Sequence, residues 1–365
     1  MPIDQLTSKS AVRQRAEEFC RRFGLRIPIL EAPMAGACPV ELAAAVANAG
    51  GMGAFGALMT QPQGIKDWAE AFRKQSNGGF QLNVWIPDPE PQRDPEAERR
   101  VRDFLSDWGA PVSPEAGDAR PPNFEKQCEA FLEIAPPVIS SIMGVYPPDF
   151  VKELKRRGIA WFACITSVKE ALTARDAGAD VLVVQGMEAG GHRGAFEASD
   201  AERHVGSLFT LLPRVADKVR DLPLVATGGI GDSRGIAAAL ILGASAVQIG
   251  TALLRSPEAK THPAWANALV DLEPEQTIAT RAFTGRLGRA VATEYALAAS
   301  APGAPPPAPY PVQRGLTANM REAGQKTGDV NRMQAWAGQA ASFATDEPAG
   351  AFIQRLWKEA EQLLP

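Results

Sequence analysis

The glycine-rich segment 185–194, which contains a histidine, is the part of the sequence best suited to chemistry. It reads Gln-Gly-Met-Glu-Ala-Gly-Gly-His-Arg-Gly and follows four aliphatic residues, 181–184, that predict a strand buried on both faces. Its glycines would let the backbone approach a flat or phosphorylated ligand, because no Cβ stands in the way. His192 is one of three histidines in the chain, and an imidazole can remove a proton or hold an anion near neutral pH. We therefore predict a catalytic role for His192.

Polar and sulfur-containing side chains are expected around the same site. Asn83 lies near the end of a predicted strand, and Gln185 ends the strand that precedes the histidine segment. An amide both donates and accepts hydrogen bonds, so these two side chains suit a ring with carbonyl and N–H groups, such as the isoalloxazine of a flavin. Met34, in an early turn that contains proline and glycine, could pack on such a ring. Glu188 has two open interpretations: it orients His192, or it caps a turn.

Two further glycine turns have the form of a phosphate site. Residues 227–232, Thr-Gly-Gly-Ile-Gly-Asp, follow a predicted strand and lead into a helix, with Asp232 or Ser233 as its N-terminal cap. Residues 248–251, Gln-Ile-Gly-Thr, follow the next strand. Backbone N–H groups in such turns, together with a helix dipole, bind anions. Barrels of alternating strands and helices commonly hold phosphate after their last two strands, so we favour a phosphate site over a pair of ordinary tight turns.

Other patterns do not support a different chemistry. Gly51, Gly53 and Gly56 satisfy a GxGxxG spacing, but they follow a predicted helix and run into a strand, the reverse of the dinucleotide fingerprint. Walker A, HExxH and nucleophile-elbow motifs are absent from the sequence, which removes the usual support for nucleotide hydrolysis, zinc proteolysis and α/β-hydrolase chemistry. The four scattered cysteines lack a CxxC spacing, so we predict no metal site and a reducing compartment.

The elements that must position these residues alternate regularly along the first part of the chain. The predicted strands lie at 27–30, 52–57, 80–85, 138–142, 159–165, 181–185, 224–227 and 246–249. Helical patterns separate them. This repeat predicts an α/β protein and favours a closed (β/α)8 TIM barrel over an open, doubly wound sheet.

Two regions depart from the alternation. Residues 87–122, rich in proline and charge, predict a surface excursion. Beyond residue 256 the pattern predicts helix at 257–272, strand at 277–283, a flexible basic turn at 285–289, a proline-rich connector at 301–311, and helices at 312–326 and 347–363. We therefore predict a barrel made of residues 1–256 and 346–365, with a smaller lid or substrate domain, 257–345, over its mouth.

Bulk properties limit the partners. The formal net charge is −4 with no long run of one sign, so a nucleic-acid footprint is not indicated. Residues 1–18 lack the apolar core of a signal peptide, and the most apolar stretch, 236–247, is too short to span a bilayer. We expect a cytoplasmic protein that acts on a small molecule, without nucleic acid or membrane, and we leave a homodimer open.

Four motifs together resemble the nitronate monooxygenases, formerly called 2-nitropropane dioxygenases. They lie at 32–36 (Ala-Pro-Met-Ala-Gly), 185–194, 226–230 (Ala-Thr-Gly-Gly-Ile) and 248–251, within a resemblance that spans roughly residues 27–290. Members of that family have an FMN-bearing barrel with a lid, and the matching histidine lies near the flavin ring. The resemblance implies FMN contacts from Ala32, Pro33, Met34, Asn83, Gln185, Gly190, Gly191, Gly228, Gly229, Gln248, Gly250 and Thr251.

The resemblance also implies an activity. An alkyl nitronate, or a nitroalkane, would be oxidised by O₂ to a carbonyl compound and nitrite, using FMN and no nicotinamide. His192 would contact the substrate, and Tyr310, in a Tyr-Pro pair that looks like the family's lid, would close the pocket. Similar motifs occur in flavin enoyl-acyl-carrier-protein reductases and NADH:quinone reductases. An NAD(P)H-dependent FMN reductase of a quinone or an enoyl thioester is therefore the alternative, although the segments at 310–311 and 336–339 favour the monooxygenase.

Overall fold

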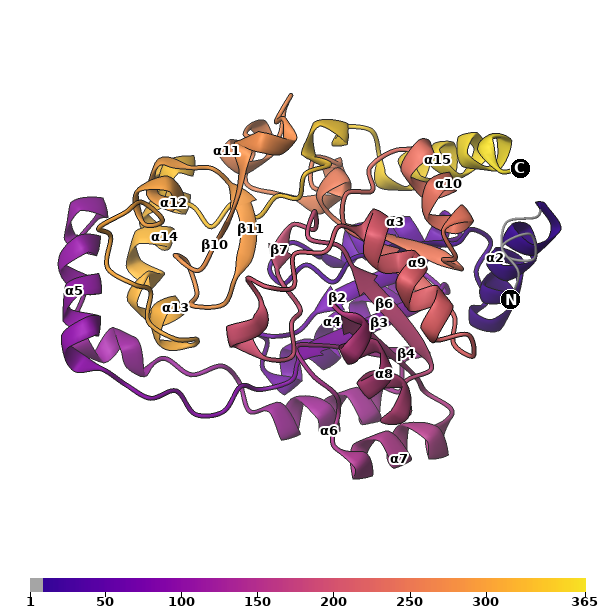
Figure 1. The fold of residues 1–365 in the computed structure, drawn as a ribbon, viewed down its shortest axis with the longest axis horizontal. Helices are drawn as coiled ribbons and strands as arrows, with labels where there is room; N and C mark the ends of the chain where they lie inside the picture. The colour runs from indigo at the N-terminus through magenta and orange to yellow at the C-terminus, as the bar shows by residue number, and fades with distance from the viewer. Residues whose placement is uncertain (1–8) are drawn as a thin grey trace.

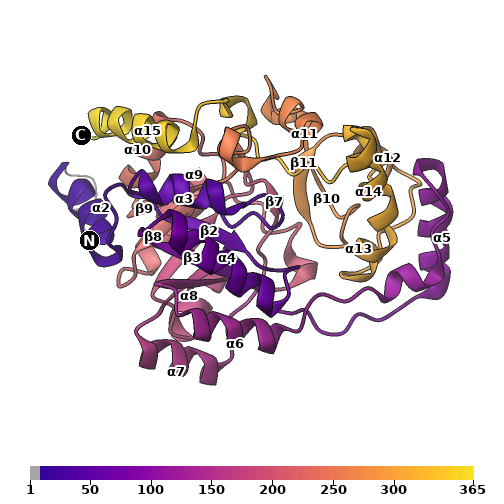
Figure 2. The ribbon, with the colours of Figure 1, turned by 180° about the vertical axis from the view of Figure 1, so that it is seen from behind.

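The chain folds around a barrel of eight parallel strands. The computed structural model describes residues 9–365, and Figures 1 and 2 show the barrel with helices around its outside. The strand order is β1-β9-β8-β6-β5-β4-β3-β2, and a parallel bridge between Leu30 and Met52 joins the two ends. The bounds are β1 Ile29–Glu31, β2 Gly53–Gly56, β3 Phe80–Trp85, β4 Val138–Ile142, β5 Ala160–Ile165, β6 Val181–Gln185, β8 Leu224–Thr227 and β9 Ala246–Ile249. The predicted (β/α)8 TIM barrel is confirmed.

Helices cover the outer face of the sheet because each buries one apolar side. Their bounds are α3 Val40–Asn48, α4 Pro62–Gln75, α6 Phe124–Ile134, α7 Pro148–Arg157, α8 Val168–Asp176, α9 Leu208–Lys218, α10 Ser233–Ile241 and α15 Ala349–Leu363. The last of them, α15, buries Phe352, Ile353 and Leu356 and packs against α3 and α10. The end of the chain therefore returns to the barrel wall, close to α2, Lys9–Phe23, in Figure 1.

The barrel interior is apolar at the amino ends of the strands and polar at their carboxyl ends. Helix α2, Lys9–Phe23, closes the amino end, where Phe19 and Phe23 lie 6.2 and 5.0 Å from the ring of Phe162 on β5. The sequence predicts a short amphipathic leader helix at 4–23, and residues 4–8 of it lie outside the described residues. At the carboxyl ends the inner side chains are amides and hydroxyls, namely Gln81, Asn83, Ser140, Gln185, Thr227 and Gln248. The polar end is where barrel enzymes have their active sites.

A second lobe lies beside the barrel mouth, at the left of Figure 1. Its centre is an antiparallel sheet of order β10-β11-β7. The bounds are β10 Thr277–Thr280, β11 Gly288–Val291, β7 Gly191–His192, α11 Pro263–Asn267, α12 Glu294–Ala298, α13 Val312–Leu316 and α14 Ala318–Thr327. Phe283, Tyr295 and Leu316 belong to a core cluster of this lobe. The division into a barrel of 1–256 plus 346–365 and a lid of 257–345 stays a prediction.

The excursion at 87–122 contains a helix that its composition did not predict. Helix α5, Pro95–Leu105, begins after Asp94, whose carboxylate accepts hydrogen bonds from the backbone N–H groups of the first turn. Val101 and Leu105 are buried in the core cluster of the second lobe. The excursion therefore crosses from the barrel to the lobe and contributes to its packing, as Figure 2 shows.

Two sequence predictions in the lobe are wrong in their extent. The helix expected at 257–272 is reduced to α11, because Pro263 starts it and Asp271 adopts a left-handed conformation with φ 51° after it ends. The basic turn expected at 285–289 ends in a strand, since Gly288 and Arg289 pair with His192 and Gly191. This pairing joins residues almost a hundred positions apart, so a local sequence pattern could not predict it.

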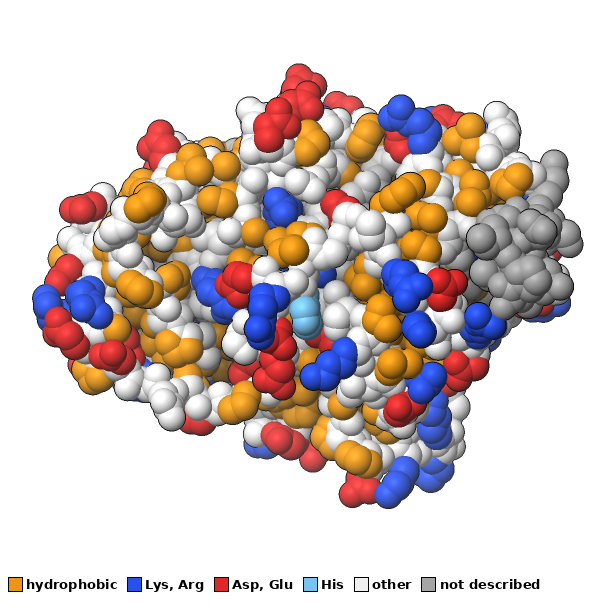
Figure 3. All heavy atoms as spheres, viewed as in Figure 1, with side chains coloured by type: hydrophobic (Ala, Val, Ile, Leu, Met, Phe, Trp, Pro, Cys, Tyr) orange, Lys and Arg blue, Asp and Glu red, His pale blue; other side chains and the backbone are white. Residues whose placement is uncertain are grey.

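The visible surface carries mixed charge. Figure 3 shows acidic and basic side chains interspersed over one face, without a broad field of one sign. Within residues 9–365, no helix combines the length and the apolar character needed to cross a membrane.

Candidate active site

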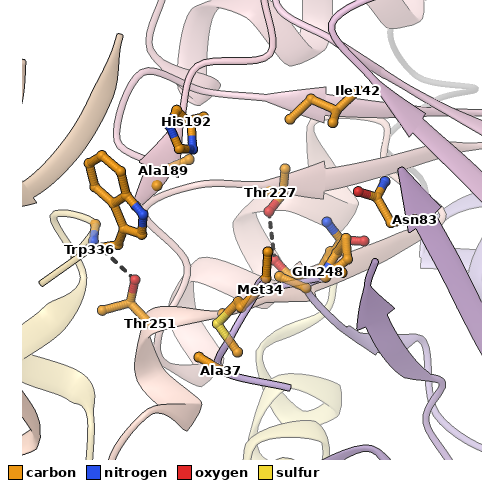
Figure 4. A pocket seen from close by; sticks show the side chains of 18 of the residues that line it. Met34, Ala37, Asn83, Ile142, Ala189, His192, Thr227, Gln248, Thr251 and Trp336 are labelled. Carbon is orange, nitrogen blue, oxygen red and sulfur yellow. Dashed lines mark hydrogen bonds between the residues drawn. The ribbon is translucent and has the colours of Figure 1, made fainter. Parts of the chain in front are cut away.

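A cavity of about 360 Å³ opens at the carboxyl ends of the barrel strands, between the barrel and the second lobe. Figure 4 shows His192 and Trp336 on one side of it, Asn83 and Gln248 on the other, and Met34 between them. The structure brings together the catalytic candidate and every predicted cofactor-binding residue as lining of this inner cavity, namely His192, Ala32, Pro33, Met34, Asn83, Gln185, Gly190, Gly191, Gly228, Gly229, Gln248, Gly250 and Thr251.

His192 is held by both parts of the molecule. It follows β6 of the barrel, yet its backbone pairs with Gly288 of β11 in the lobe. Its Nε2 lies 2.8 Å from the hydroxyl of Thr284. Trp85 and Trp336 enclose the ring edge to face, with centroids 4.5 and 4.7 Å away. The hydrogen bond to Thr284 fixes the ring orientation and leaves Nδ1 as the nitrogen that can meet a substrate.

The surroundings keep the imidazole neutral. Burial, followed by the positive charges of Arg314 and Arg286, lowers the pKa of His192 to about 3. The ring retains some exposure only because it lines the cavity. A neutral imidazole near two guanidinium groups in a buried site suits an anionic ligand better than a cationic one.

Hydrogen bonds from Gln185 and Arg193 fix the histidine segment. Gln185 donates from Nε2 to the His192 carbonyl oxygen at 3.0 Å and accepts from the Gly194 N–H at 2.8 Å. The buried guanidinium of Arg193 donates to the carbonyl oxygens of Gln185 and His204. Burial lowers the pKa of Arg193 to about 10. The amide of Gln185 is therefore used by its own loop, and its expected contact with a flavin ring stays a prediction.

The structure decides the role of Glu188. Both of its carboxylate oxygens lie 3.0 Å from the backbone N–H of Leu208, the first residue of α9. Thr284, and not Glu188, is bonded to the imidazole of His192. Glu188 therefore caps a turn at a helix start, which is the second of its two interpretations.

Glycines after β8 and β9 form a cradle in the wall of the inner cavity. Gly228 and Gly229 follow β8 with φ of +104° and +69°, a conformation that side chains disfavour. At Gly250, after β9, an added Cβ would lie 3.1 Å from Ala32 Cβ and 3.2 Å from Met34 Sδ. The next helix, α10, is capped by Asp232, which accepts from the N–H of Gly235 at 3.0 Å.

Amide side chains line the side of the inner cavity opposite His192 and Trp336. Gln81 donates to Gln248 Oε1 at 3.1 Å, and Asn83 donates to Ser140 Oγ at 3.0 Å. Among the described residues, the buried Oε1 atoms of Gln81 and Gln334 have no hydrogen-bond partner. Because buried acceptors are normally paired, these two atoms fit a bound ligand that carries N–H or O–H groups.

A buried acid and a thiol support the turn that carries Met34. Cys38 Sγ lies 2.8 Å from the backbone N of Met34, and the Ala37 N–H donates to the Met34 carbonyl oxygen at 2.8 Å. Below them Glu31 is fully buried and accepts from the N–H of Ala54 at 2.9 Å. Burial raises the pKa of Glu31 to about 8, so this carboxyl group is mostly protonated at neutral pH.

Three lining residues near His192 were not predicted from the sequence. Trp85 ends β3, whereas Trp336 and Arg314 come from the lobe. Of the described residues that line the inner cavity, Arg314 is the one Lys or Arg, and burial lowers its pKa. The sequence indicates Trp336 only as the first residue of the segment 336–339, without a place in the site. These three residues meet at the cavity because of how the lobe packs on the barrel, and a local sequence pattern does not predict that packing.

Tyr310 lies outside the lining of the inner cavity. Its ring packs on Trp85, with centroids 5.1 Å apart, so it lies behind the aromatic wall that encloses His192. Its predicted contact with substrate therefore has no direct geometric support at the inner cavity and stays a prediction.

The fold and the cavity define an enzyme of the barrel class with its site at the carboxyl ends of the strands. The family model described as nitronate monooxygenase matches residues 18–359. The chain is 35% identical over 353 residues to a nitronate monooxygenase of Pseudomonas aeruginosa, covering 94% of this chain and 99% of that protein. For a nitronate monooxygenase of Paraburkholderia phytofirmans the identity is 34%, with 93% of each covered. The chain belongs to the nitronate monooxygenase family of oxidoreductases.

Solved structures agree. The structure of a nitroalkane oxidase from Streptomyces ansochromogenes matches with a TM-score of 0.85 at 32% identity, covering 93% of this chain and 98% of that one. FabK from Thermotoga maritima matches less closely, with a TM-score of 0.73 at 26% identity, covering 95% and 96%.

Proposed function

We propose that this enzyme uses FMN to oxidise alkyl nitronates with O₂ to a carbonyl compound and nitrite, without nicotinamide. The observation that carries the proposal is that His192, held neutral, and Arg314 line the same cavity as the glycine cradle. A nitronate is an anion, and family membership agrees with this substrate class. Neutral nitroalkanes are expected to be poorer substrates.

The residues present fit FMN. The cradle at Gly228, Gly229 and Gly250 leaves no room for side chains where a phosphate would bind, and α10 starts beside it. The unpartnered Oε1 of Gln81, with Asn83 nearby on β3, would meet the polar edge of the ring. FMN, when bound, supplies the redox chemistry by taking electrons from the substrate and delivering them to O₂.

The chain's own side chains would bind and orient the substrate. Arg314 attracts the nitronate group into a site enclosed by protein, where charge pairing is stronger than in bulk water. Nδ1 of His192 holds the anion by a hydrogen bond, or takes the proton of a nitroalkane, while Thr284 keeps the ring in place. Trp85 and Trp336 exclude water from the reacting atoms.

We also propose a reducing, cytoplasmic setting, because all four cysteines are free and buried. The lid function of 257–345, the substrate contact of Tyr310 and a homodimer remain predictions beside this proposal.

The absorption spectrum of the purified protein, followed by anaerobic titration, tests the function. A bound flavin should be visible, and anaerobic ethyl nitronate should bleach it. Air should then restore the spectrum, with nitrite formed in proportion. Rapid bleaching by NADH or NADPH, with no response to nitronate, would instead assign an NAD(P)H-dependent reductase of a quinone or enoyl thioester. A protein unable to take up FMN would end the proposal.

A further inference from the structure

A second cavity, of about 290 Å³, lies next to the first. The two ends of the excursion form its walls, at 86–91 and 120–125, together with Tyr310 and Pro311. Leu58 and Trp85 line both cavities, so side chains form part of the boundary between them. We call this second space the outer cavity. It does not include His192 or the glycine cradle.

The walls of the outer cavity are apolar and stiff. Its prolines are Pro87, Pro89, Pro91, Pro121, Pro122 and Pro311. Proline fixes the backbone φ, so these walls have little freedom to collapse. Val84, Ile86 and Phe124 add further apolar surface. Such a lining favours a ligand segment that is itself apolar.

Several polar groups of the outer cavity already have partners. Arg120 pairs with Glu90 at 3.0 Å, and Asp88 pairs with Arg286. The amide of Gln127 donates to the carbonyl oxygens of Ala57 and Thr60, both at 2.9 Å. With Glu125 also in the lining, acidic groups outnumber basic ones, which disfavours an anionic ligand segment.

Tyr310 supplies one polar group without a partner. Its hydroxyl is buried and has no hydrogen-bond partner among residues 9–365. Tyr310 lines the outer cavity and packs on Trp85, at the boundary with the inner cavity. Buried hydroxyls are normally paired. The unpaired hydroxyl of Tyr310 therefore indicates a ligand that has a hydrogen-bond acceptor close to this residue.

We propose that the outer cavity is the subsite for the distal part of the substrate, a neutral and largely apolar chain with one acceptor near Tyr310. This inference rests on the proposed function, because the reacting nitronate group would lie beside His192. FMN would fill much of the inner cavity, so a substrate longer than a few carbons needs space elsewhere. The outer cavity adjoins the inner cavity at Leu58 and Trp85 and offers that space.

Chain length tests the proposal. For the FMN-loaded enzyme, KM should fall from ethyl through butyl to hexyl nitronate, by up to about fourfold for each added methylene. Glu125→Trp should fill the outer cavity from its rim on α6, raising KM for hexyl nitronate about tenfold while leaving ethyl nitronate unchanged. Glu129→Trp is the matched control, since Glu129 is exposed on the same helix and does not line the cavity. It should change neither constant.

A second arm needs no turnover. Calorimetric titration with butanoate and octanoate, unreactive anions of the same shape, should show tighter binding of the longer chain, lost in Glu125→Trp. Tyr310→Phe should reduce the advantage of a chain that contains an ether oxygen over an all-carbon chain. Ethyl nitronate turnover without any length dependence would overturn the outer subsite and leave the proposed function intact. If no nitronate is oxidised, the function fails, and the carboxylate titration alone decides the subsite.

Discussion

Two parts of the inner cavity are built in different ways. In the glycine cradle, Gly228, Gly229 and Gly250 present backbone just after the ends of barrel strands. Around His192, the wall is made of side chains from distant segments, with Trp85 from the barrel and Trp336 and Arg314 from the lobe. A backbone site depends on local conformation, whereas a side-chain site depends on how two bodies of the protein meet.

This difference separates binding from reactivity. Damage around His192 should abolish turnover and spare FMN binding, whereas damage to the cradle should weaken FMN binding.

Replacing His192 should have the largest effect. We expect His192→Asn to lower kcat/KM for a nitronate by roughly 10²–10⁴-fold, the range for lost proton transfer or hydrogen bonding, and to leave the Kd for FMN unchanged. Steady-state rates and fluorescence titration of FMN measure the two effects. Unchanged turnover would remove His192 from the mechanism.

The same variant should alter acid stability. The pKa of His192 is lowered to about 3 in the folded protein, below its ordinary 6.5. The unfolded chain therefore binds the extra proton first, and stability falls as pH drops from 6.5 toward 3. His192→Asn should show a shallower loss of melting temperature over that range, and an equally steep loss would contradict the lowered pKa.

Gly229→Ala should come next, through the cofactor. Gly229 and Gly158 share a φ of +69°, but nothing lies within 4 Å of a Cβ added at Gly158, which ends α7. Both alanine variants should lose stability by about 1–2 kcal/mol from backbone strain. Only Gly229→Ala should also weaken FMN binding, by about tenfold. Equal FMN affinity in the two variants would show that the cradle does not hold the cofactor.

Arg314 should affect substrate affinity more than chemistry. Removal of a charge-assisted contact costs about 1.5–3 kcal/mol, so Arg314→Ala should raise KM for a nitronate by roughly tenfold or more. Arg314→Lys keeps the charge and should recover most of the affinity. If alanine and lysine behave alike, charge does not explain the role of Arg314.

Glu31 should have the smallest effect on activity. Its folded pKa of about 8 lies above the ordinary 4.5, so its contribution to stability is complete below about pH 4.5 and is lost as pH rises to about 8. Glu31→Gln should flatten the fall in the free energy of unfolding across this range while turnover stays close to that of the parent. Urea titrations at several pH values measure it, and parallel profiles would contradict a buried neutral acid.

The comparison also explains what could be read from the sequence. The barrel was predictable because its strands are short apolar runs separated by helices, and the cradle because its glycines are local to strand ends. Asp232 as a helix cap and the position of His192 at the mouth followed from the same local rules.

The remainder depended on contacts between distant residues. Gly288 and Arg289 form a strand only because β7 lies beside them. Trp85 and Arg314 belong to no recognisable motif. Tyr310, which was predicted to contact substrate, packs on Trp85 and is not part of the lining of the inner cavity. Helix α5 was hidden in a segment whose proline and charge content resembled a loop.

The pairing of β7 with β11 has a mechanical consequence. If the lobe rotated as a rigid body, it would either move the imidazole of His192 with it or break the hydrogen bonds between β7 and β11. Entry and exit of small molecules must then rely on rearranged side chains and connecting segments, and the reactive nitrogen is assembled or dismantled together with the wall that faces it.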